Sequence, residues 1–112
     1  MAARLKAAIV VSALLRQVDL AGGAGAVLFR GDPDAGSLLF LLADRGVVRA
    51  VRERGLLPDG RSGWIATGPA DPSDVQALHD YLEKRRRFDP DLWVVELDGL
   101  TAEAFESLAG DA

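Results

Sequence analysis

The most constraining feature of this sequence is the run Leu-Trp-Val-Val-Glu-Leu at residues 92–97. Its β-branched and aromatic side chains, without glycine or proline, are typical of a β-strand. Nearly every position is apolar, so both faces of the strand should be covered, as in the interior of a sheet. The exception is Glu96, which shares a face with Leu92 and Val94 because side chains alternate along a strand. We therefore expect a central strand at residues 92–97, with the Glu96 carboxylate reaching water at the rim of the sheet or meeting a cation.

A helix is predicted just before this strand. Asp71 suits the N-cap position and Pro72 the first helical position. Four consecutive bases, residues 84–87, would occupy the last turn, where cations favour the exposed carbonyl groups. Pro90 then disfavours helical backbone at Asp89 and turns the chain towards the strand.

The N-terminal part of the chain predicts another helix. Apolar residues recur at helical spacing from Ile9 to Val18, and the glycine pair at 22–23 should end the helix. An alternative is a strand at residues 5–11, followed by a shorter helix with Ser12 as its N-cap.

Between these helices the sequence predicts a sheet. Four strands separated by turns are expected at residues 26–30, 37–43, 47–53 and 63–67. Their short connections should force antiparallel pairing, because a parallel return needs a crossover. Arginines in the strand at 47–53 indicate a position near the edge of the sheet, with one face in water.

A last helix should start after Thr101 as its N-cap and end at Gly110. The predicted fold class is therefore α+β. We expect one compact domain over residues 1–112, in which a helix is followed by a mainly antiparallel sheet. A second helix, a further central strand and a short C-terminal helix complete it.

Composition excludes several kinds of site. The 112 residues include no cysteine, so disulfides, thiol catalysis and cysteine-ligated metals are excluded. His79 is the single histidine, which excludes sites built from several imidazoles. A formal net charge of −4 argues against general nucleic-acid binding.

The N-terminal segment resembles part of a signal peptide, because Arg4 and Lys6 precede an apolar run at residues 7–15. Arg16 makes this run too short to span a membrane. Because its helical periodicity continues beyond Arg16, we interpret the segment as the first structural element. We expect a cytoplasmic protein that has no membrane partner.

Two aspartate–proline–aspartate corners carry the candidate ligand-binding residues. These are Arg30, Asp32, Asp34, Arg86, Arg87, Asp89 and Asp91. If the corners meet, their four carboxylates could hold Mg²⁺ or Ca²⁺, and the arginines could hold a phosphate. The other interpretation, which we favour, is that aspartate and proline form turns and that the arginines are ion-pair partners or a solvated helix end.

The chain offers no recognisable set of catalytic residues. We therefore expect a small non-catalytic binding or adaptor module that uses no cofactor or metal. Its partner would be a second copy of itself or another protein, and not a nucleic acid. The alternative is a small enzyme or ligand-binding protein that uses the two corners for a divalent metal or a phosphorylated ligand.

Three segments together resemble a small bacterial family of uncharacterised proteins. They are RLKA at residues 4–7 with VSALLR at 11–16, RGDPDAG at 30–36, and RRFDPDLWVVE at 86–96. The resemblance covers nearly the whole chain and implies a single compact cytoplasmic domain. It implies no activity, because the family has none assigned.

Overall fold

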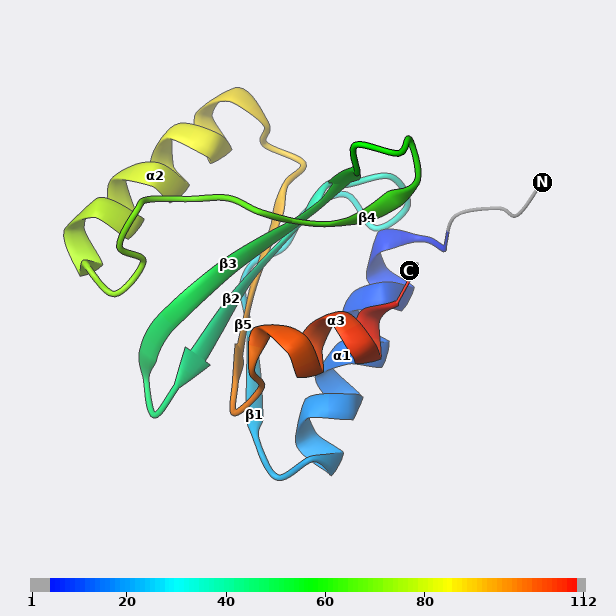
Figure 1. The fold of residues 1–112 in the computed structure, drawn as a ribbon. Coiled ribbons are helices and arrows are strands. Elements are labelled where there is room, and N and C mark those ends of the chain that lie inside the picture. The colour runs from blue at the N-terminus through cyan, green and yellow to red at the C-terminus, as the bar shows by residue number, and fades with distance from the viewer. Residues whose placement is uncertain (1–4, 111–112) are drawn as a thin grey trace.

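The protein is a five-stranded sheet with helices on both faces, as Figure 1 shows for a computed structural model that describes residues 5–110. Arg4 and both ends of the expected 1–112 domain lie outside the described residues. The elements in chain order are α1 (Ala7–Leu20), β1 (Ala24–Phe29), β2 (Leu38–Asp44), β3 (Val47–Leu56), β4 (Ser62–Ala66), α2 (Val75–Phe88), β5 (Trp93–Asp98) and α3 (Ala102–Ala109). Helix α2 covers one face of the sheet, and α1 and α3 cover the other.

The strand order is β1-β5-β2-β3-β4. Strand β5 runs parallel to β2, and the other three neighbouring pairs are antiparallel. The expected α+β fold with a mainly antiparallel sheet is therefore confirmed. Strand β5 is interior, as expected, with Trp93 and Val95 packed on the α1 side and Val94 on the α2 side.

One expectation about strand pairing was wrong. Strand β1 does not pair with β2, because β5 lies between them. The loop at residues 30–37, which connects β1 to β2, crosses β5. Strand β3 lies near the edge of the sheet as expected, next to the edge strand β4, and the other edge is β1. One of the arginines of β3 is paired across the larger core: the Arg52 Nε atom lies 3.5 Å from a carboxylate oxygen of Glu106 on α3.

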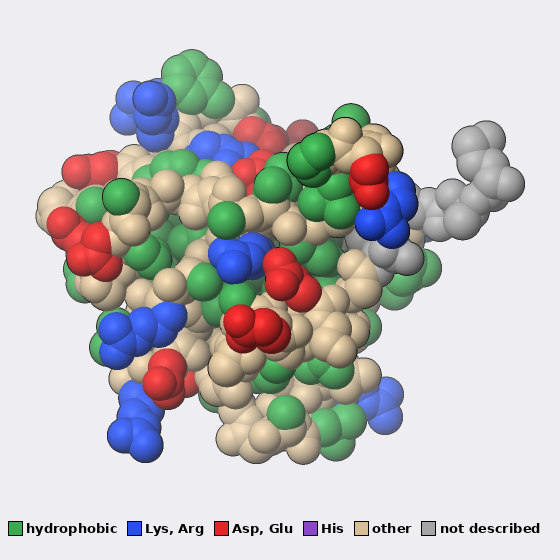
Figure 2. All heavy atoms as spheres, in the orientation of Figure 1, with side chains coloured by type: hydrophobic (Ala, Val, Ile, Leu, Met, Phe, Trp, Pro, Cys, Tyr) green, Lys and Arg blue, Asp and Glu red, His purple; other side chains and the backbone are tan. Residues whose placement is uncertain are grey.

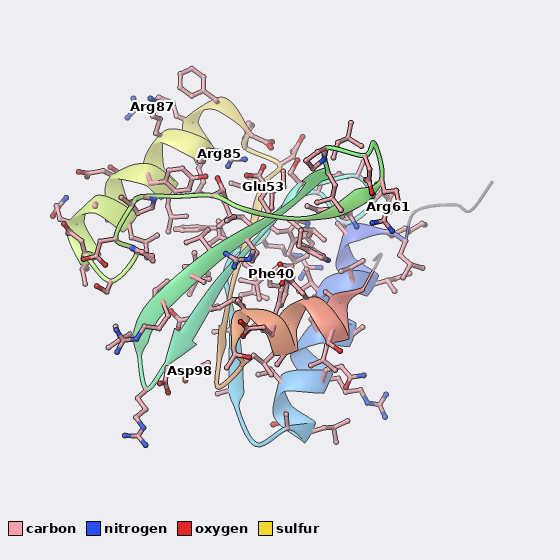
Figure 3. All side chains as sticks on the ribbon, viewed as in Figure 1. Phe40, Glu53, Arg61, Arg85, Arg87 and Asp98 are labelled. Carbon is pink, nitrogen blue, oxygen red and sulfur yellow. The ribbon has the colours of Figure 1, made fainter. Side chains whose placement is uncertain are left out.

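The larger core lies between the sheet and the pair α1 and α3. At its centre, Phe40, Trp64 and Phe105 form a cluster with ring centroids 5.0–5.4 Å apart. Two of the three pairs are edge-to-face, which is a favourable geometry for aromatic rings. Figure 3 places Phe40 at the middle of the molecule. The α2-side core is smaller, and Leu78 and Leu82 supply the buried face of the helix.

Helix α1 begins at Ala7, so the alternative strand at residues 5–11 is not formed. Thr101 caps α3 as predicted, with its side chain accepting a hydrogen bond from the Ala104 N–H at 3.1 Å. Among the helices of residues 5–110, none has the length and apolar character required to cross a bilayer.

The start of α2 differs from the prediction. Its N-cap is Asp74, whose carboxylate accepts the Ala77 N–H at 3.1 Å, and Pro72 lies before the helix. The Asp71 carboxylate instead accepts the backbone N–H of Ser73, in a turn that immediately precedes the helix. Aspartate suits the N-cap at either position. Asp74 is the N-cap here because the Asp71 side chain is already hydrogen-bonded within its own turn.

Candidate functional site

The two aspartate corners lie side by side. The backbone N–H of Asp32 donates to the carbonyl oxygen of Asp91 at 3.0 Å, and the Trp93 indole N–H donates to the carbonyl oxygen of Asp32 at 2.7 Å. A Cβ atom at Gly31 would lie 2.0 Å from the Asp91 oxygen, so only glycine permits this approach. We call this contact the corner junction, formed by residues 31–36 and 89–93.

Within the corner junction, the carboxylates bind their own turns. The Asp32 carboxylate accepts the N–H groups of Asp34 at 3.2 Å and Ala35 at 2.7 Å, and that of Asp89 accepts the Asp91 N–H at 3.1 Å. The Asp34 carboxylate lies 3.7 Å from the Lys6 ammonium, where both are exposed. No three carboxylates of the junction converge within the described chain. Ligand binding by these residues stays a prediction.

The corner junction also caps helix α1. The N–H groups of Ala7 and Ala8 donate to the carbonyl oxygens of Asp34 at 3.2 Å and Pro33 at 2.9 Å. Helix N-termini leave such N–H groups without partners in the helix itself. The N-cap residue Lys6 makes no side-chain cap, so the turn at residues 31–36 takes over that role.

The three predicted arginines are divided between different surfaces. The Arg30 guanidinium lies 5.1 Å from the ring centre of Trp93, whose side chain belongs to the α1-side core. The Arg86 guanidinium lies 3.5 Å from the ring centre of Phe29, which packs on the α2-side core. Figure 3 shows Arg87 pointing outwards from α2. The guanidinium groups of Arg30 and Arg86 are therefore each engaged in a cation–π contact with an aromatic ring of the protein.

Arg85, which was not among the candidate binding residues, makes the shortest contacts of the basic run at residues 84–87. Its Nη1 and Nη2 atoms donate to the two carboxylate oxygens of Glu53 on β3, each at 2.6 Å. Nη1 also donates to the Tyr81 hydroxyl at 2.8 Å, and that hydroxyl lies 2.7 Å from the Thr67 hydroxyl. The hydrogen bonds to Glu53 raise the pKa of Arg85 further above its ordinary value.

Helical spacing alone predicts that Arg85 faces the sheet. It lies three residues after Leu82 and seven after Leu78, which places it on the buried stripe of α2. A cation on that stripe needs a partner from the sheet. The identity of that partner, Glu53, depended on the strand order.

The main hollow on the α2 side is an apolar groove of about 520 Å³, which we call the α2 groove. Its apolar walls come from β1, β2, β3 and α2. They include Leu28, Phe29, Leu41, Val48, Leu78 and Leu82. Val75 at the start of α2 is 80% exposed and Leu28 is 43% exposed, so apolar surface continues out of the groove on both sides. Such contiguous exposed apolar surface is typical of interaction sites.

Glu96 is the one acidic residue that lines the α2 groove. It is half-buried on β5, on the α2 face together with Val94, as its position in the strand predicted. Across the described chain, no residue forms a hydrogen bond or an ion pair with its carboxylate. A carboxylate that is partly removed from water favours a cation nearby.

His79 lies on the wall of the α2 groove, and its Nε2 atom is 3.6 Å from the Glu83 carboxylate. With Asp80 these residues form a group whose possible metal-ligand atoms lie within 4.8 Å of one another. All three side chains are exposed, and this is an ordinary arrangement on a helix surface. The group therefore gives no argument for a metal.

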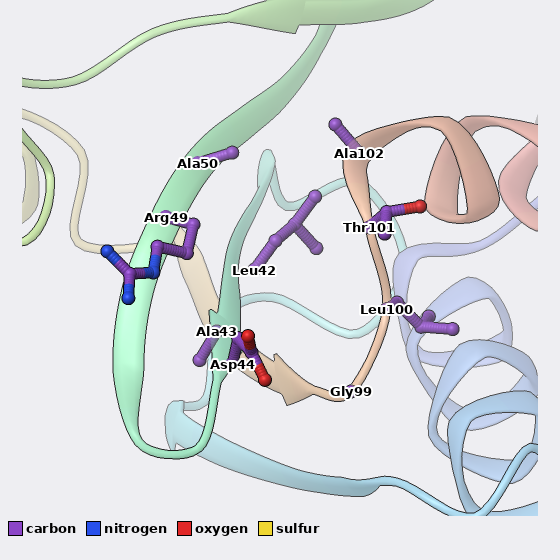
Figure 4. Close-up of a pocket in the computed structure, with 9 residues that line it drawn as sticks. All are labelled: Leu42, Ala43, Asp44, Arg49, Ala50, Gly99, Leu100, Thr101 and Ala102. Atoms are coloured by element: carbon purple, nitrogen blue, oxygen red, sulfur yellow. The ribbon is translucent and has the colours of Figure 1, made fainter.

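A second pocket, of about 390 Å³, lies on the opposite face between the β2–β3 hairpin and the start of α3. Figure 4 shows Leu42, Ala50 and Ala102 around it, with the Arg49 side chain pointing away. The Thr101 side chain is engaged in capping α3. The lining of this pocket is thus mainly apolar, with Asp44 and Arg49 as its charged residues.

The surface seen in Figure 2 carries both signs of charge. Acidic and basic side chains are interspersed over this face, with hydrophobic side chains between them. No extended area of one sign dominates this view.

Residues 5–106 match the family described as "Protein of unknown function (DUF1491)". The chain belongs to this family. A crystal structure of a DUF1491 family protein from Caulobacter crescentus CB15 has 32% sequence identity and a TM-score of 0.73, and the match covers 85% of this chain and 88% of that one. The expected resemblance to an uncharacterised family is confirmed.

Two solution structures are also similar. An NMR structure of a DUF1491 family protein from C. crescentus CB15 has 30% identity and a TM-score of 0.76, covering 95% of this chain and 96% of that one. The solution structure of protein Atu0922 from A. tumefaciens has 29% identity and a TM-score of 0.71, covering 94% of each chain. No curated protein matches the chain. The DUF1491 family has no assigned function, so membership of it implies none for this protein.

Proposed function

We propose that this protein is a small non-catalytic binding module, and that its ligand is an apolar group that carries a positive charge. The observation that carries the proposal is the half-buried Glu96 carboxylate in an apolar groove, without a partner in the described chain. Ligand sites commonly combine apolar walls with a few polar groups that orient the ligand. Here the walls supply affinity and Glu96 supplies the preference for a cation.

The charge of the groove supports a cationic ligand over an anionic one. Glu96 lies within the groove, and Glu83 stands on α2 beside His79 at its wall. Arg86, which lies close to His79 and Glu83, is packed on the ring of Phe29. An anion entering the groove would meet a carboxylate in surroundings where like charges repel strongly.

The proposal includes a bacterial origin and a cytoplasmic location. Support for the origin comes from the relatives in C. crescentus and A. tumefaciens. Support for the location comes from α1, which contains the apolar run that resembles part of a signal peptide. Val10, Leu14 and Val18 of this helix are buried in the α1-side core, so the segment is an integral part of the fold.

The test is an NMR titration of ¹⁵N-labelled protein with hexylammonium, hexanol and hexanoate, which share one alkyl chain and differ in charge. We expect saturable shifts of amide signals around the α2 groove, with the tightest binding for hexylammonium. Glu96→Gln should reduce its affinity to that of hexanol, since an interaction with a charged group contributes about 1.5–3 kcal/mol. Glu103→Gln, an exposed glutamate on α3, is the matched control. Equal binding of hexanoate, or unchanged affinity in Glu96→Gln, would contradict the proposal.

A further inference from the structure

Strand β1 is an open edge of the sheet beside the α2 groove. Its one strand neighbour in the described chain is β5, and every residue from Ala24 to Leu28 is exposed. Its sequence, Ala-Gly-Ala-Val-Leu-Phe, contains no charge and no proline. Natural proteins usually protect edge strands with charged side chains or proline, because an open edge is a template for another strand. Strand β1 lacks both of these protections, and its one irregularity is a bulge between Val27 and Phe29, at the end of the strand.

The side chains of β1 alternate between the two faces of the sheet. Ala26 is directly paired with Glu96, so both lie on the α2 face, and Val27 is paired with Val95 on the α1 face. A bulge between Val27 and Phe29 displaces Leu28, which lines the groove. The regular part of the edge therefore ends at an exposed leucine at the mouth of the groove.

The pairing of Ala26 with Glu96 determines what an added strand can bring to the carboxylate. A residue opposite Ala26 on such a strand would lie two strand spacings from Glu96, which is roughly 10 Å. Ala26 has only a methyl group, so a long side chain can pass over it. Lys or Arg, with a flexible apolar stem and a charged end, can then reach the Glu96 carboxylate.

From these relationships we infer that the ligand is an extended segment of another protein. The segment adds to β1 as a sixth strand, and a Lys or Arg opposite Ala26 forms an ion pair with Glu96. Apolar side chains two residues away on either side lie on the same face as that base, and one of them contacts Leu28 at the groove. Main-chain hydrogen bonds to an edge strand, with alternate side chains in a groove, are a known mode of peptide recognition. This inference rests on the proposed function and specifies the chemistry of the ligand.

A second copy of this chain fits the site less well. If β1 of one copy paired with β1 of another, the side chains offered to the α2 face would be those of Ala24, Ala26 and Phe29, since paired residues share a face. None of them is basic. Arg30, the next residue along, packs on Trp93 of the α1-side core. Charge complementarity with Glu96 therefore favours a different protein segment.

The experiment uses the capped peptide Ser-Leu-Thr-Lys-Thr-Leu-Ser and the full chain. Binding is followed by NMR titration, and protection of the β1 amides by hydrogen exchange. We expect saturable binding with slowed exchange in residues 24–29. A second peptide has norleucine in place of lysine, and a third is N-methylated at alternate residues so that it cannot pair with a strand. Each change should weaken binding at least about ten-fold, the effect of losing one charge-assisted interaction or several main-chain hydrogen bonds.

Three results of these experiments would each contradict one part of the proposal. Equal binding of the N-methylated peptide would overturn strand addition, while saturable hexylammonium binding would leave the proposed function intact. Equal binding of the norleucine peptide would overturn recognition of a base by Glu96. A dimer of the free protein with protected β1 amides would show that a second copy occupies the edge, and would overturn the choice of partner.

Discussion

Arg85 and Glu53 form a two-pronged ion pair between α2 and β3, with both nitrogen–oxygen distances at 2.6 Å. The two side chains are 26% and 22% exposed, so the pair is largely withdrawn from water. Arg85 lies towards the C-terminal end of α2 (Figure 3), beyond the groove-lining residues of the helix, which extend from Val75 to Leu82. The pair thus fixes the end of the helix beyond the groove.

Glu53→Gln should lower the free energy of unfolding by about 1–3 kcal/mol, because it removes the negative charge opposite a partly buried guanidinium. Urea denaturation followed by circular dichroism measures the loss. Glu83→Gln is the matched control, since Glu83 is exposed and makes only a 3.6 Å contact with His79. A loss for Glu53→Gln no greater than that of the control would show that the ion pair does not hold α2 to the sheet.

Replacing both partners distinguishes the energy of the ion pair from the energy of side-chain packing. The double variant Glu53→Leu with Arg85→Met should be more stable than Arg85→Met alone, because it leaves no carboxylate without a counter-charge. A double-mutant cycle from the same urea curves gives the coupling energy. A coupling of zero would mean that the two side chains contribute independently.

Gly31→Ala should lower the free energy of unfolding by at least about 3 kcal/mol, because the new Cβ would clash with the Asp91 backbone oxygen. Gly60→Ala is the control, since Gly60 has a φ of +86° and open space around it. The control should lose only the conformational cost of that backbone, about 1–2 kcal/mol. Thermal unfolding compares the two, and a larger loss at Gly60 would contradict the close approach at the corner junction.

Asp32→Ala should cost about 1 kcal/mol, because its carboxylate holds two backbone N–H groups of its own turn. Asp32→Asn keeps a side-chain oxygen acceptor and should restore most of that stability. Mg²⁺ or Ca²⁺ should leave the melting temperature of the wild-type protein unchanged. A saturable rise in melting temperature that Asp32→Asn abolishes would instead support a metal site at the corner junction.

Ala26→Lys places a base directly opposite Glu96 within the chain itself. A cross-strand pair of opposite charge contributes about 0.2–1 kcal/mol, so this variant should be slightly more stable than the wild type. In a Glu96→Gln background the same substitution should bring no gain. The variant should also lose hexylammonium binding, because its own lysine occupies the carboxylate. Unchanged hexylammonium binding in Ala26→Lys would contradict the placement of Glu96.

The sequence determined the local elements and the faces of their side chains. Periodicity indicated the first helix, capping residues indicated α2 and α3, and the apolar run indicated β5. Alternation placed Glu96 on the face that the α2 groove occupies. These features depend on neighbouring residues along the chain, so propensity and period are enough to predict them. The predicted turn at residues 44–46 forms too, with positive φ at Arg45 and Gly46.

Only the tertiary structure decided how distant segments meet. The Asp98 carboxylate accepts the N–H groups of Arg45 at 3.0 Å and Gly46 at 2.7 Å, although these residues lie more than fifty positions earlier. That contact exists because β5 enters the sheet between β1 and β2. The same strand order gives Glu96 its neighbour Ala26. Strand order depends on the paths of loops and on the packing of both cores at once, which local patterns along the chain do not encode.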